Sequence, residues 1–256
     1  MSATTTNAGL SGPSLRGHLW RILAAPVVVA VVAAGVAIWL AGAELDSIEE
    51  RTLNGSYIVA RVIEHLQLSL AASALVAALA IPAGVLIHRS QSRLLRAVVL
   101  ALANIGQATP AVGVVILLAI VWKTGFSTAL IALVAYAFLP VLRNTLTGLA
   151  EVDGAVRESA LGMGMTRTQV LFRIELPLAS PVILAGLRTS LVFAVGVATI
   201  ATFINAGGLG DMIVNGLKLQ RYPVLVVGAG LVAGIAILID WLAGLVEEYA
   251  RPRGLS

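Results

Sequence analysis

Residues 148–180 read GLAEVDGAVRESALGMGMTRTQVLFRIELPLAS and connect two long apolar segments. Asp153 can cap a short helix after it. Gly164 stands where a helix needs a residue that adopts positive φ in order to turn. Between them, the residues that recur at the spacing of one apolar helical face are Val156, Ala160 and Met163. This half of the connection therefore predicts a short amphipathic helix that ends in a glycine turn.

The second half of the connection predicts another short helix. Thr166 and Gln169 have the spacing of a capping box, so a helix begins there. We expect it to end before Pro177, because the residue before a proline disfavours the α conformation. Ser180 and Pro181 then open the next apolar segment as a cap and a first helical residue. Two short helices joined by a glycine turn at a membrane surface are suited to docking against another protein.

The composition on either side of this connection is that of a membrane protein. Of the 256 residues, 59% are apolar and only 12% are charged, whereas a soluble domain carries about 25% charged residues. This excludes a globular soluble enzyme, and the high hydrophobicity excludes a disordered chain. With no cysteine present, disulfides, thiolate metal sites and cysteine nucleophiles are excluded as well. The sequence predicts an all-α integral membrane protein.

Six segments are long and apolar enough to cross a membrane, which requires about 20 residues each. They are residues 22–43, 66–87, 97–122, 128–147, 181–205 and 224–246. The third is interrupted near Pro110, which allows either two short helices or one kinked span. We favour the kinked span, because neither half is long enough to cross alone.

The basic residues predict the orientation. Eleven of the 17 Lys and Arg residues lie in the tails and loops on the side of the termini, five lie on the opposite side, and Arg188 lies within a span. By the positive-inside tendency both termini are cytoplasmic. Residues 1–21 and 247–256 are then cytoplasmic tails, the first rich in Ser, Thr and Gly and expected to be disordered. Residues 22–43 imitate a signal peptide, but the apolar stretch is too long for one, so we expect an uncleaved helix.

The loop resembles a known motif. Its sequence Glu158-Ser159-Ala160, three residues, Gly164, nine residues, then Ile174-Glu175-Leu176-Pro177 is similar to the EAA loop of the permease subunits of binding-protein-dependent ABC importers. That loop reads E-A-A, three residues, G, nine residues, I-x-L-P, and only Ser159 departs from it. The resemblance implies that the loop inserts into a groove of a cytoplasmic ATPase and transmits its closure. The implied coupling residues are Glu158, Ser159, Ala160, Gly164, Ile174, Leu176 and Pro177.

The resemblance extends over about residues 66–246 and is similar to the quaternary-ammonium branch, which carries glycine betaine, carnitine or choline. Its further matches are QATP at 107–110, LPVLRNT at 139–145, GMGMT at 162–166 and GGLG at 207–210. The family has a five-helix core of the type I importer class, which residues 66–246 would supply. The span at residues 22–43 would be an extra helix outside that core.

The resemblance also implies an assembly in the bacterial inner membrane. The expected partners are cytoplasmic ATPase subunits, a second permease subunit (identical or related) and an extracytoplasmic solute-binding protein, all around a lipid bilayer. ATP and Mg are expected on the ATPase, since neither Lys123 nor Lys218 stands in a P-loop. We expect no enzyme activity, cofactor or metal site in this chain. The net charge of +4 fits basic membrane-flanking loops better than a nucleic-acid partner.

Several polar or flexible residues within the apolar segments are candidates for the transport pathway. Pro110 removes a helical hydrogen bond, and backbone freed at membrane depth is tolerated where it lines a cavity or is buried in protein. We therefore place Gln107, Thr109 and Pro110 near the pathway, together with Asn144, although interhelical hydrogen bonds are an equally simple role. The residues of a candidate outer gate are Gly207, Gly208 and Gly210. A tight loop without a gating role is the alternative.

Two charges lie within the apolar segments, Arg188 in the fifth and Asp240 in the sixth. Because unpaired charges in a bilayer are costly, we expect the two to form an ion pair or to face a wet cavity. His18, His65 and His88 are scattered, which argues against a metal site. The aromatic residues that could surround a trimethylammonium group, with apolar packing as the default role, are Tyr136, Phe138, Phe193 and Phe203.

Three alternatives to a quaternary-amine importer remain from the sequence. The first is the same machine with methionine or another small solute as its substrate. The second is a secondary transporter or channel that works without ATP, which inverted repeats and paired discontinuous spans would favour. The sequence contains no convincing repeat. A membrane enzyme is the third.

Overall fold

The computed structural model describes residues 15–90 and 92–250, and every regular element within those ranges is helical. Five of these helices are long and apolar enough to span a membrane, or six if one sharply bent pair counts as a span. The five are α1 (Leu15–Ala41), α3 (Gly55–Ser90), α6 (Phe126–Ala150), α9 (Leu176–Ala198) and α11 (Tyr222–Ala250). The predicted all-α membrane fold of about six spans is confirmed.

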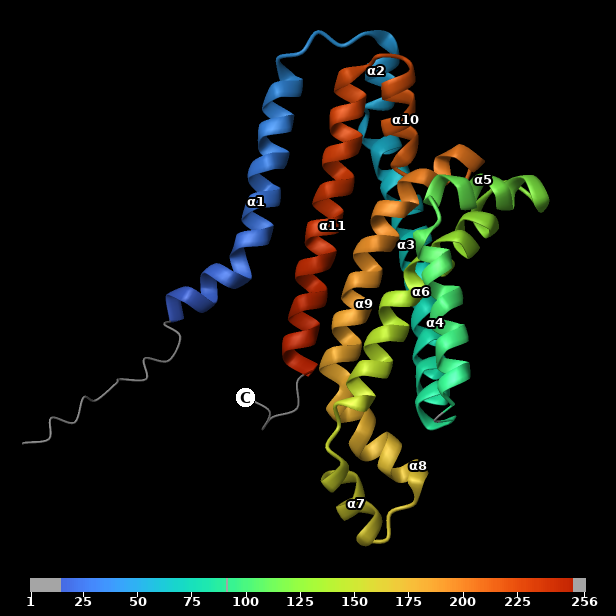
Figure 1. Ribbon diagram of the computed structural model, residues 1–256. Helices are drawn as coiled ribbons and strands as arrows, with labels where there is room; N and C mark the ends of the chain where they lie inside the picture. The colour runs from blue at the N-terminus through green and yellow to red at the C-terminus, as the bar shows by residue number, and fades with distance from the viewer. Residues whose placement is uncertain (1–14, 91, 251–256) are drawn as a thin grey trace, which may run out of the picture.

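Helix α6 lies at the centre of the bundle, between α3 and α9 (Figure 1). In its most apolar 18-residue window 44% of the residues are buried, against 17% for α11 and none for α1. Glycines permit the close approach of its neighbours. A Cβ on Gly84 of α3 would come within 2.6 Å of Thr145, and one on Gly186 of α9 within 2.7 Å of Asn144. Close packing at small residues is the usual way in which membrane helices associate.

Helices α11 and α1 lie outside this centre. Helix α11 packs against α9, and α1 packs mainly against α11 at the edge of the molecule (Figure 1). At one end of the bundle the short helices α2 (Ser47–Thr52) and α10 (Gly210–Lys218) connect the long ones. The loop predicted to dock protrudes from the opposite end. We call these the α10 end and the α7 end.

The third predicted span is broken rather than kinked. Helices α4 (Arg93–Ala108) and α5 (Ala111–Val121) meet at an angle of 97°, and α5 projects sideways from the bundle (Figure 1). Thr109 and Pro110 both have extended ψ angles, of 138° and 125°. Two consecutive extended residues redirect the chain, and the conformation of Thr109 is the one that a following proline favours. The alternative of two short helices describes this geometry, and the two helices together form either one broken span or a re-entrant loop.

The second helix of the connecting loop does not end before Pro177, which corrects the expectation above. Helix α8 (Arg167–Val170) continues through a π-helical turn, η1 (Leu171–Glu175), directly into α9. Pro177 is the second residue of α9, directly after η1, and the helical segment continues through it.

Pro181 does not begin a new helix either, because it lies inside α9. Its missing N–H leaves the carbonyl of Pro177 without its helical donor. The Ser180 hydroxyl donates to that carbonyl at 2.8 Å instead, as Ser and Thr side chains do around prolines in membrane helices. The loop and the fifth span are thus one continuous helical segment.

Some helices are longer than the predicted spans. Helix α3 has 36 residues, about 54 Å at the α-helical rise, against a hydrocarbon core of about 30 Å. Both of its ends therefore carry polar side chains beyond the core. Helix α1 begins at Leu15 rather than at residue 22. Residues 1–14 and 251–256, which belong to the predicted tails, lie outside the described residues.

Candidate functional site

Helix α7 (Gly154–Gly162) protrudes from the α7 end of the bundle together with α8 (Figure 1). The Asp153 carboxylate caps it, accepting from the backbone N–H of Ala155 at 2.8 Å. At its other end Gly164 has φ +87°. The N–H of Met165 donates to the carbonyl of Ala160 at 3.2 Å and that of Gly164 to Leu161 at 3.0 Å. These two bonds form a Schellman motif, which requires the left-handed residue that glycine supplies.

The apolar residues of α7 are mostly exposed. Ala160 is 1% exposed, but Val156 is 41% and Met163 77% exposed, and Leu161 on another face is also open. On this chain only one of the three residues of the predicted apolar face, Ala160, is buried. The reason is that the rest of this chain reaches α7 along one edge only, at Ala160. The remaining apolar side chains are exposed, and so is Phe172 in η1; exposed apolar side chains that gather in a patch mark interaction surfaces.

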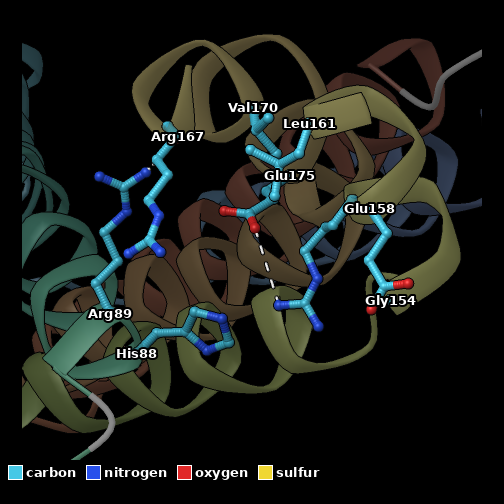
Figure 2. A pocket seen from close by; sticks show the side chains of 9 residues that line it. His88, Arg89, Gly154, Glu158, Leu161, Arg167, Val170 and Glu175 are labelled. Atoms are coloured by element: carbon cyan, nitrogen blue, oxygen red, sulfur yellow. Dashed lines mark hydrogen bonds and ion pairs between the residues drawn. The ribbon is translucent and has the colours of Figure 1, made fainter. Parts of the chain in front are cut away.

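A polar cavity of about 470 Å³ separates α7 from the end of α3 (Figure 2). The Arg157 guanidinium of α7 lies 3.9 Å from the carboxylate of Glu175 in η1. The Arg89 guanidinium, at the end of α3, donates to the backbone carbonyl of Arg167 at 2.5 Å. His88 and Glu158 line the same cavity. The loop is thus tied to α3 by one contact and to α9, through η1, by another.

Among the predicted loop residues, Glu158 and Ser159 are exposed on α7, next to buried Ala160. Gly164 is exposed, and a Cβ built on it would meet nothing within 4 Å. The residues of the second half of the motif lie in the continuous helix, with Ile174 in η1 and with Leu176 and Pro177 in the first turn of α9. The second half of the motif is therefore continuous with α9.

The predicted pathway residues do not come together in one place. Gln107 and Thr109 are half-buried and Pro110 is exposed at the break between α4 and α5, and the Thr109 hydroxyl donates to the carbonyl of Ile105 at 2.7 Å. This break lies beside Ala135 of α6, since a Cβ on Gly106 would be 3.8 Å from its carbonyl. Asn144 is nine residues further along α6 (144 − 135), or about 13 Å.

The predicted glycine gate lies at the α10 end. Gly207 and Gly208 have φ of +77° and +91°, and a Cβ on Gly210 would come within 2.0 Å of the Thr199 carbonyl. The Gly208 N–H donates to the carboxylate of Glu64 on α3 at 2.9 Å. Arg61 joins this carboxylate to that of Asp211, at 2.9 and 2.8 Å. The loop is therefore fixed to α3 in a defined conformation.

Beneath this loop His65 is fully buried. Its Nε2 lies 3.1 Å from the carbonyl of Val195, whereas its Nδ1 has no hydrogen-bond partner. The carbonyl makes Nε2 the protonated nitrogen. A Cβ on Gly208 would lie 3.2 Å from Nδ1, so the glycine is needed for the loop to close over the ring.

The structure brings Arg188 and Asp240 together. Nε and Nη2 of Arg188 donate to the two carboxylate oxygens of Asp240, each at 2.6 Å. This bidentate geometry is the strongest form of an arginine–carboxylate contact. The pair joins α9 to α11, as the sequence predicted. Among the described residues no group of three or more His, Asp or Glu side chains could hold a metal ion.

Comparison with known proteins gives the family. The model of the binding-protein-dependent transport system inner membrane component family matches residues 80–251, which is more than half of the chain. This protein belongs to that family. The motif spacing in the loop between α6 and α9 had indicated the same permeases, and that resemblance is confirmed.

Curated relatives of this permease agree over most of its length. It is 44% identical over 200 residues to the carnitine transport permease protein OpuCD of Listeria monocytogenes, covering 78% of this chain and 89% of the relative. It is 40% identical to the glycine betaine/carnitine/choline transport system permease protein OpuCD of Bacillus subtilis, covering 78% and 86%. A structure titled as an inward-facing conformation of the MetNI methionine ABC transporter has the same fold, with a TM-score of 0.69, 20% identity and coverage of 79% and 99%.

The sequence analysis missed several residues that hold the permease's loops in place. Glu64 bonds a residue 144 positions away, and Arg89 one that is 78 positions away. No local pattern marks such residues, because the partner of each is brought close only by the packing of the helices.

Proposed function

We propose that this chain is the membrane-spanning subunit of an ATP-driven importer for a quaternary-ammonium osmoprotectant such as glycine betaine, carnitine or choline. The observation that carries the proposal is the similarity to permeases named for those solutes, at 40–44% identity over 78% of the chain. The methionine transporter, at 20% identity, supports the fold and not the substrate.

The docking surface for the ATPase is α7 with its glycine turn. The exposed apolar side chains of Val156, Leu161 and Met163 would be covered by a groove on the ATPase, which would account for their exposure on this chain. Glu158 and Ser159, exposed on the same helix, would contact that groove. Gly164 leaves the turn without a side chain, so the groove can approach its backbone closely.

Motion of the docked loop would reach the membrane by two routes. The first is covalent, because η1 runs directly into α9. The second is the contact of Arg89 with the Arg167 carbonyl, which joins the loop to α3. Closure of the ATPase subunits would thus tilt α3 and α9 relative to each other and open the pathway to alternate sides.

The exposed helix α7 and the excess of basic residues predicted for that side support the orientation that we propose. The α7 end would face the cytoplasm and the ATPase, and both termini would be cytoplasmic. The α10 end faces outward, where a solute-binding protein would deliver its cargo above the loop of Gly207, Gly208 and Gly210. The pathway would lie at the contact with a second permease subunit, and α1 would be the extra helix beyond the core.

Hydrolysis of ATP belongs to the partner subunits in this proposal, with ATP and Mg bound there. This chain contributes no catalytic group. Its work is mechanical, and is done by the loop and by the helices connected to it.

The test is reconstitution of the permease with its ATPase and binding protein in proteoliposomes. We expect ATP-dependent uptake of labelled glycine betaine, carnitine or choline, and none without the ATPase. Methionine serves as the control solute. Uptake that is driven by an ion gradient alone, or uptake of methionine in place of the quaternary amines, would refute the proposal.

A further inference from the structure

A second cavity, of about 290 Å³, opens beside the ion pair between α9 and α11. It is lined by Arg188, Thr189, Val192 and Phe193 of α9 and by Asp240 of α11. None of these residues belongs to the loop at the α7 end or to the glycine loop at the α10 end. The volume is at the lower end of the range of small-molecule sites, so the cavity fits a compact ligand.

The arginine in this cavity is held in place on three sides. Asp240, Gly244 and Glu247 share one face of α11, at helical spacings of four and three residues. Asp240 holds two nitrogens of Arg188, and a carboxylate oxygen of Glu247 lies 3.7 Å from Nη1. Gly244 makes room for the guanidinium, because a Cβ there would come within 3.0 Å of Nη1.

The cluster consists of one arginine and two carboxylates. The Glu247 side chain is 15% exposed, whereas that of Asp240 is 44% exposed. The carboxylate that faces the cavity is therefore Asp240. Two N–H groups of the Arg188 guanidinium donate to Asp240 and its third nitrogen lies 3.7 Å from Glu247, so all three nitrogens already face carboxylates and little capacity is left for an anionic ligand.

An aromatic ring completes the lining. Phe193 is 45% exposed and lies on the cavity wall one turn of α9 from Thr189. A carboxylate and an open aromatic face are the two groups that recognise an alkylated ammonium ion, the first through its charge and the second through its π electrons. A methylated ammonium keeps its charge but donates no hydrogen bond, so such a site does not need further acceptors.

The position of the cluster also argues for a wet or protein-covered surface. Arg188 is twelve residues into α9 (188 − 176), or about 18 Å along the helix. Its side chain is 36% exposed on this chain. Charged groups at that depth face the bundle interior or a water-filled cavity rather than lipid. This face of α9 and α11 is therefore turned toward the pathway or the second permease subunit.

We propose that the cavity between Phe193 and Asp240 binds the trimethylammonium group of the substrate as it crosses the membrane. The proposal rests on the proposed function and assigns its substrate contact within the permease. Because Arg188 is occupied, the site recognises the ammonium end and not a carboxylate. Choline and tetramethylammonium, which have no carboxylate, should bind as well as glycine betaine.

The first experiment measures uptake by the full transporter in proteoliposomes. Phe193→Leu keeps an apolar side chain and removes the aromatic face, while Phe193→Tyr restores it. We expect Phe193→Leu to lower the glycine betaine uptake rate about tenfold, with Phe193→Tyr close to wild type. The matched control is Phe126→Leu, at a residue 42% exposed on α6, which should change the rate less than twofold. Equal rates for Phe193→Leu and wild type would overturn the proposal.

The second experiment detects binding without transport. Because the chain has no cysteine, Thr189→Cys places a single thiol on the cavity wall of the permease. In the ATP-free complex, a trimethylammonium thiosulfonate should label this thiol faster than a sulfonate reagent does. Tetramethylammonium should slow that labelling at least threefold, measured by mass spectrometry of the permease chain. Ile131→Cys on α6, which does not line the cavity, is the control that tetramethylammonium should leave unchanged.

The two experiments separate the site from the proposed function. If the wild-type complex imports quaternary amines but tetramethylammonium does not protect Thr189→Cys, the site is refuted and the function stands. If the wild-type complex imports no quaternary amine, the proposed function fails. Protection of Thr189→Cys by tetramethylammonium would then still establish an ammonium-binding cavity. A lack of protection would refute the cavity as well as the function.

Discussion

The carboxylate of Glu64 accepts a hydrogen bond from the backbone N–H of Gly208 at 2.9 Å, across 144 residues of sequence. This contact attaches the glycine loop at the α10 end to α3. The contact also requires a glycine at position 207, because a Cβ there would come within 2.4 Å of the same carboxylate. The loop that we propose as an outer gate is therefore held by the Glu64 carboxylate, and it can approach α3 because Gly207 and Gly208 have no side chains.

Removing this acceptor should loosen the loop. In Glu64→Ala the Gly208 N–H loses its partner and Arg61 loses one of its two carboxylates, at a cost of about 1–2 kcal/mol. We expect faster amide hydrogen exchange at residues 205–210 than in wild type. Gln67→Ala, at an exposed residue of the same helix, is the control. Unchanged exchange in Glu64→Ala would contradict the role given to this contact.

The glycine turn after α7 offers a matched pair of substitutions. Gly162 and Gly164 both have open space around a built Cβ, but only Gly164 has positive φ. Gly164→Ala should cost about 1–2 kcal/mol of local strain and reduce the amount of ATPase that co-purifies. Gly162→Ala should leave association unchanged or strengthen the helix.

A bulky residue at position 164 tests the docking surface itself. Gly164→Trp should abolish association with the ATPase, while insertion in the membrane, followed by yield and gel filtration, stays normal. ATP-dependent uptake at the wild-type rate in this variant would contradict the assignment of α7 as the docking helix.

The ion pair between α9 and α11 predicts a non-additive pair of substitutions. Asp240→Asn leaves Arg188 with only the Glu247 contact, at a cost of about 1–3 kcal/mol. In Arg188→Met with Asp240→Leu, no charge of the pair remains without its partner. The thermal midpoint in detergent should therefore fall further in the single variant than in the double. Equal falls would argue against energetic coupling of the two residues.

A contact at the α10 end predicts a pH dependence. Asp46 hydrogen-bonds Arg221 at the start of α11 and accepts from the N–H groups of Ile48 and Glu49 at 2.9 Å. The hydrogen bond from Arg221, followed by those backbone donors, lowers the pKa of Asp46 from 3.8 to about 2. A depressed folded-state pKa means that the stabilisation is complete above about pH 4 and is lost as pH falls toward 2.

The measurement is hydrogen exchange at the start of α2 between pH 4.5 and 2. After correction for the intrinsic rate, protection in wild type should fall across this interval. Asp46→Asn should show lower protection at pH 4.5 and little further change. Since Asp46 is half-exposed, high salt should weaken the difference. A wild-type protection that is constant down to pH 2 would refute the prediction.

Features encoded by neighbouring residues were predicted well. The Asp153 cap, the Thr166–Gln169 capping box and the glycine turn at residue 164 all have the expected geometry. Each depends on side chains and backbone groups within four residues of one another, so the sequence alone contains both partners. The ion pair of Arg188 and Asp240 was also foreseen, because two opposite charges in apolar segments at matching depth have few other partners.

Features that depend on residues distant in the sequence were not predicted. Local rules favoured a helix end before Pro177 and a start at Ser180, but packing against α6 and the Ser180 hydroxyl keep α9 continuous. Val156 and Met163 share the apolar face that the spacing predicted, but only the packing shows that this chain leaves both of them exposed. The break at Pro110 was recognised, yet its 97° angle exceeds what a proline kink by itself suggests.

The sequence by itself determined that this is an all-helical membrane protein, that its docking loop follows α6, and that it belongs with the permeases. Hydropathy and motif spacing suffice for these, because each is a property of residues taken in order. The tertiary structure decided which distant residues meet: Glu64 with the Gly208 N–H, Arg89 with the Arg167 carbonyl, and Phe193 and Asp240 around one cavity. Those contacts join separate helices, and their geometry follows only from how the helices pack.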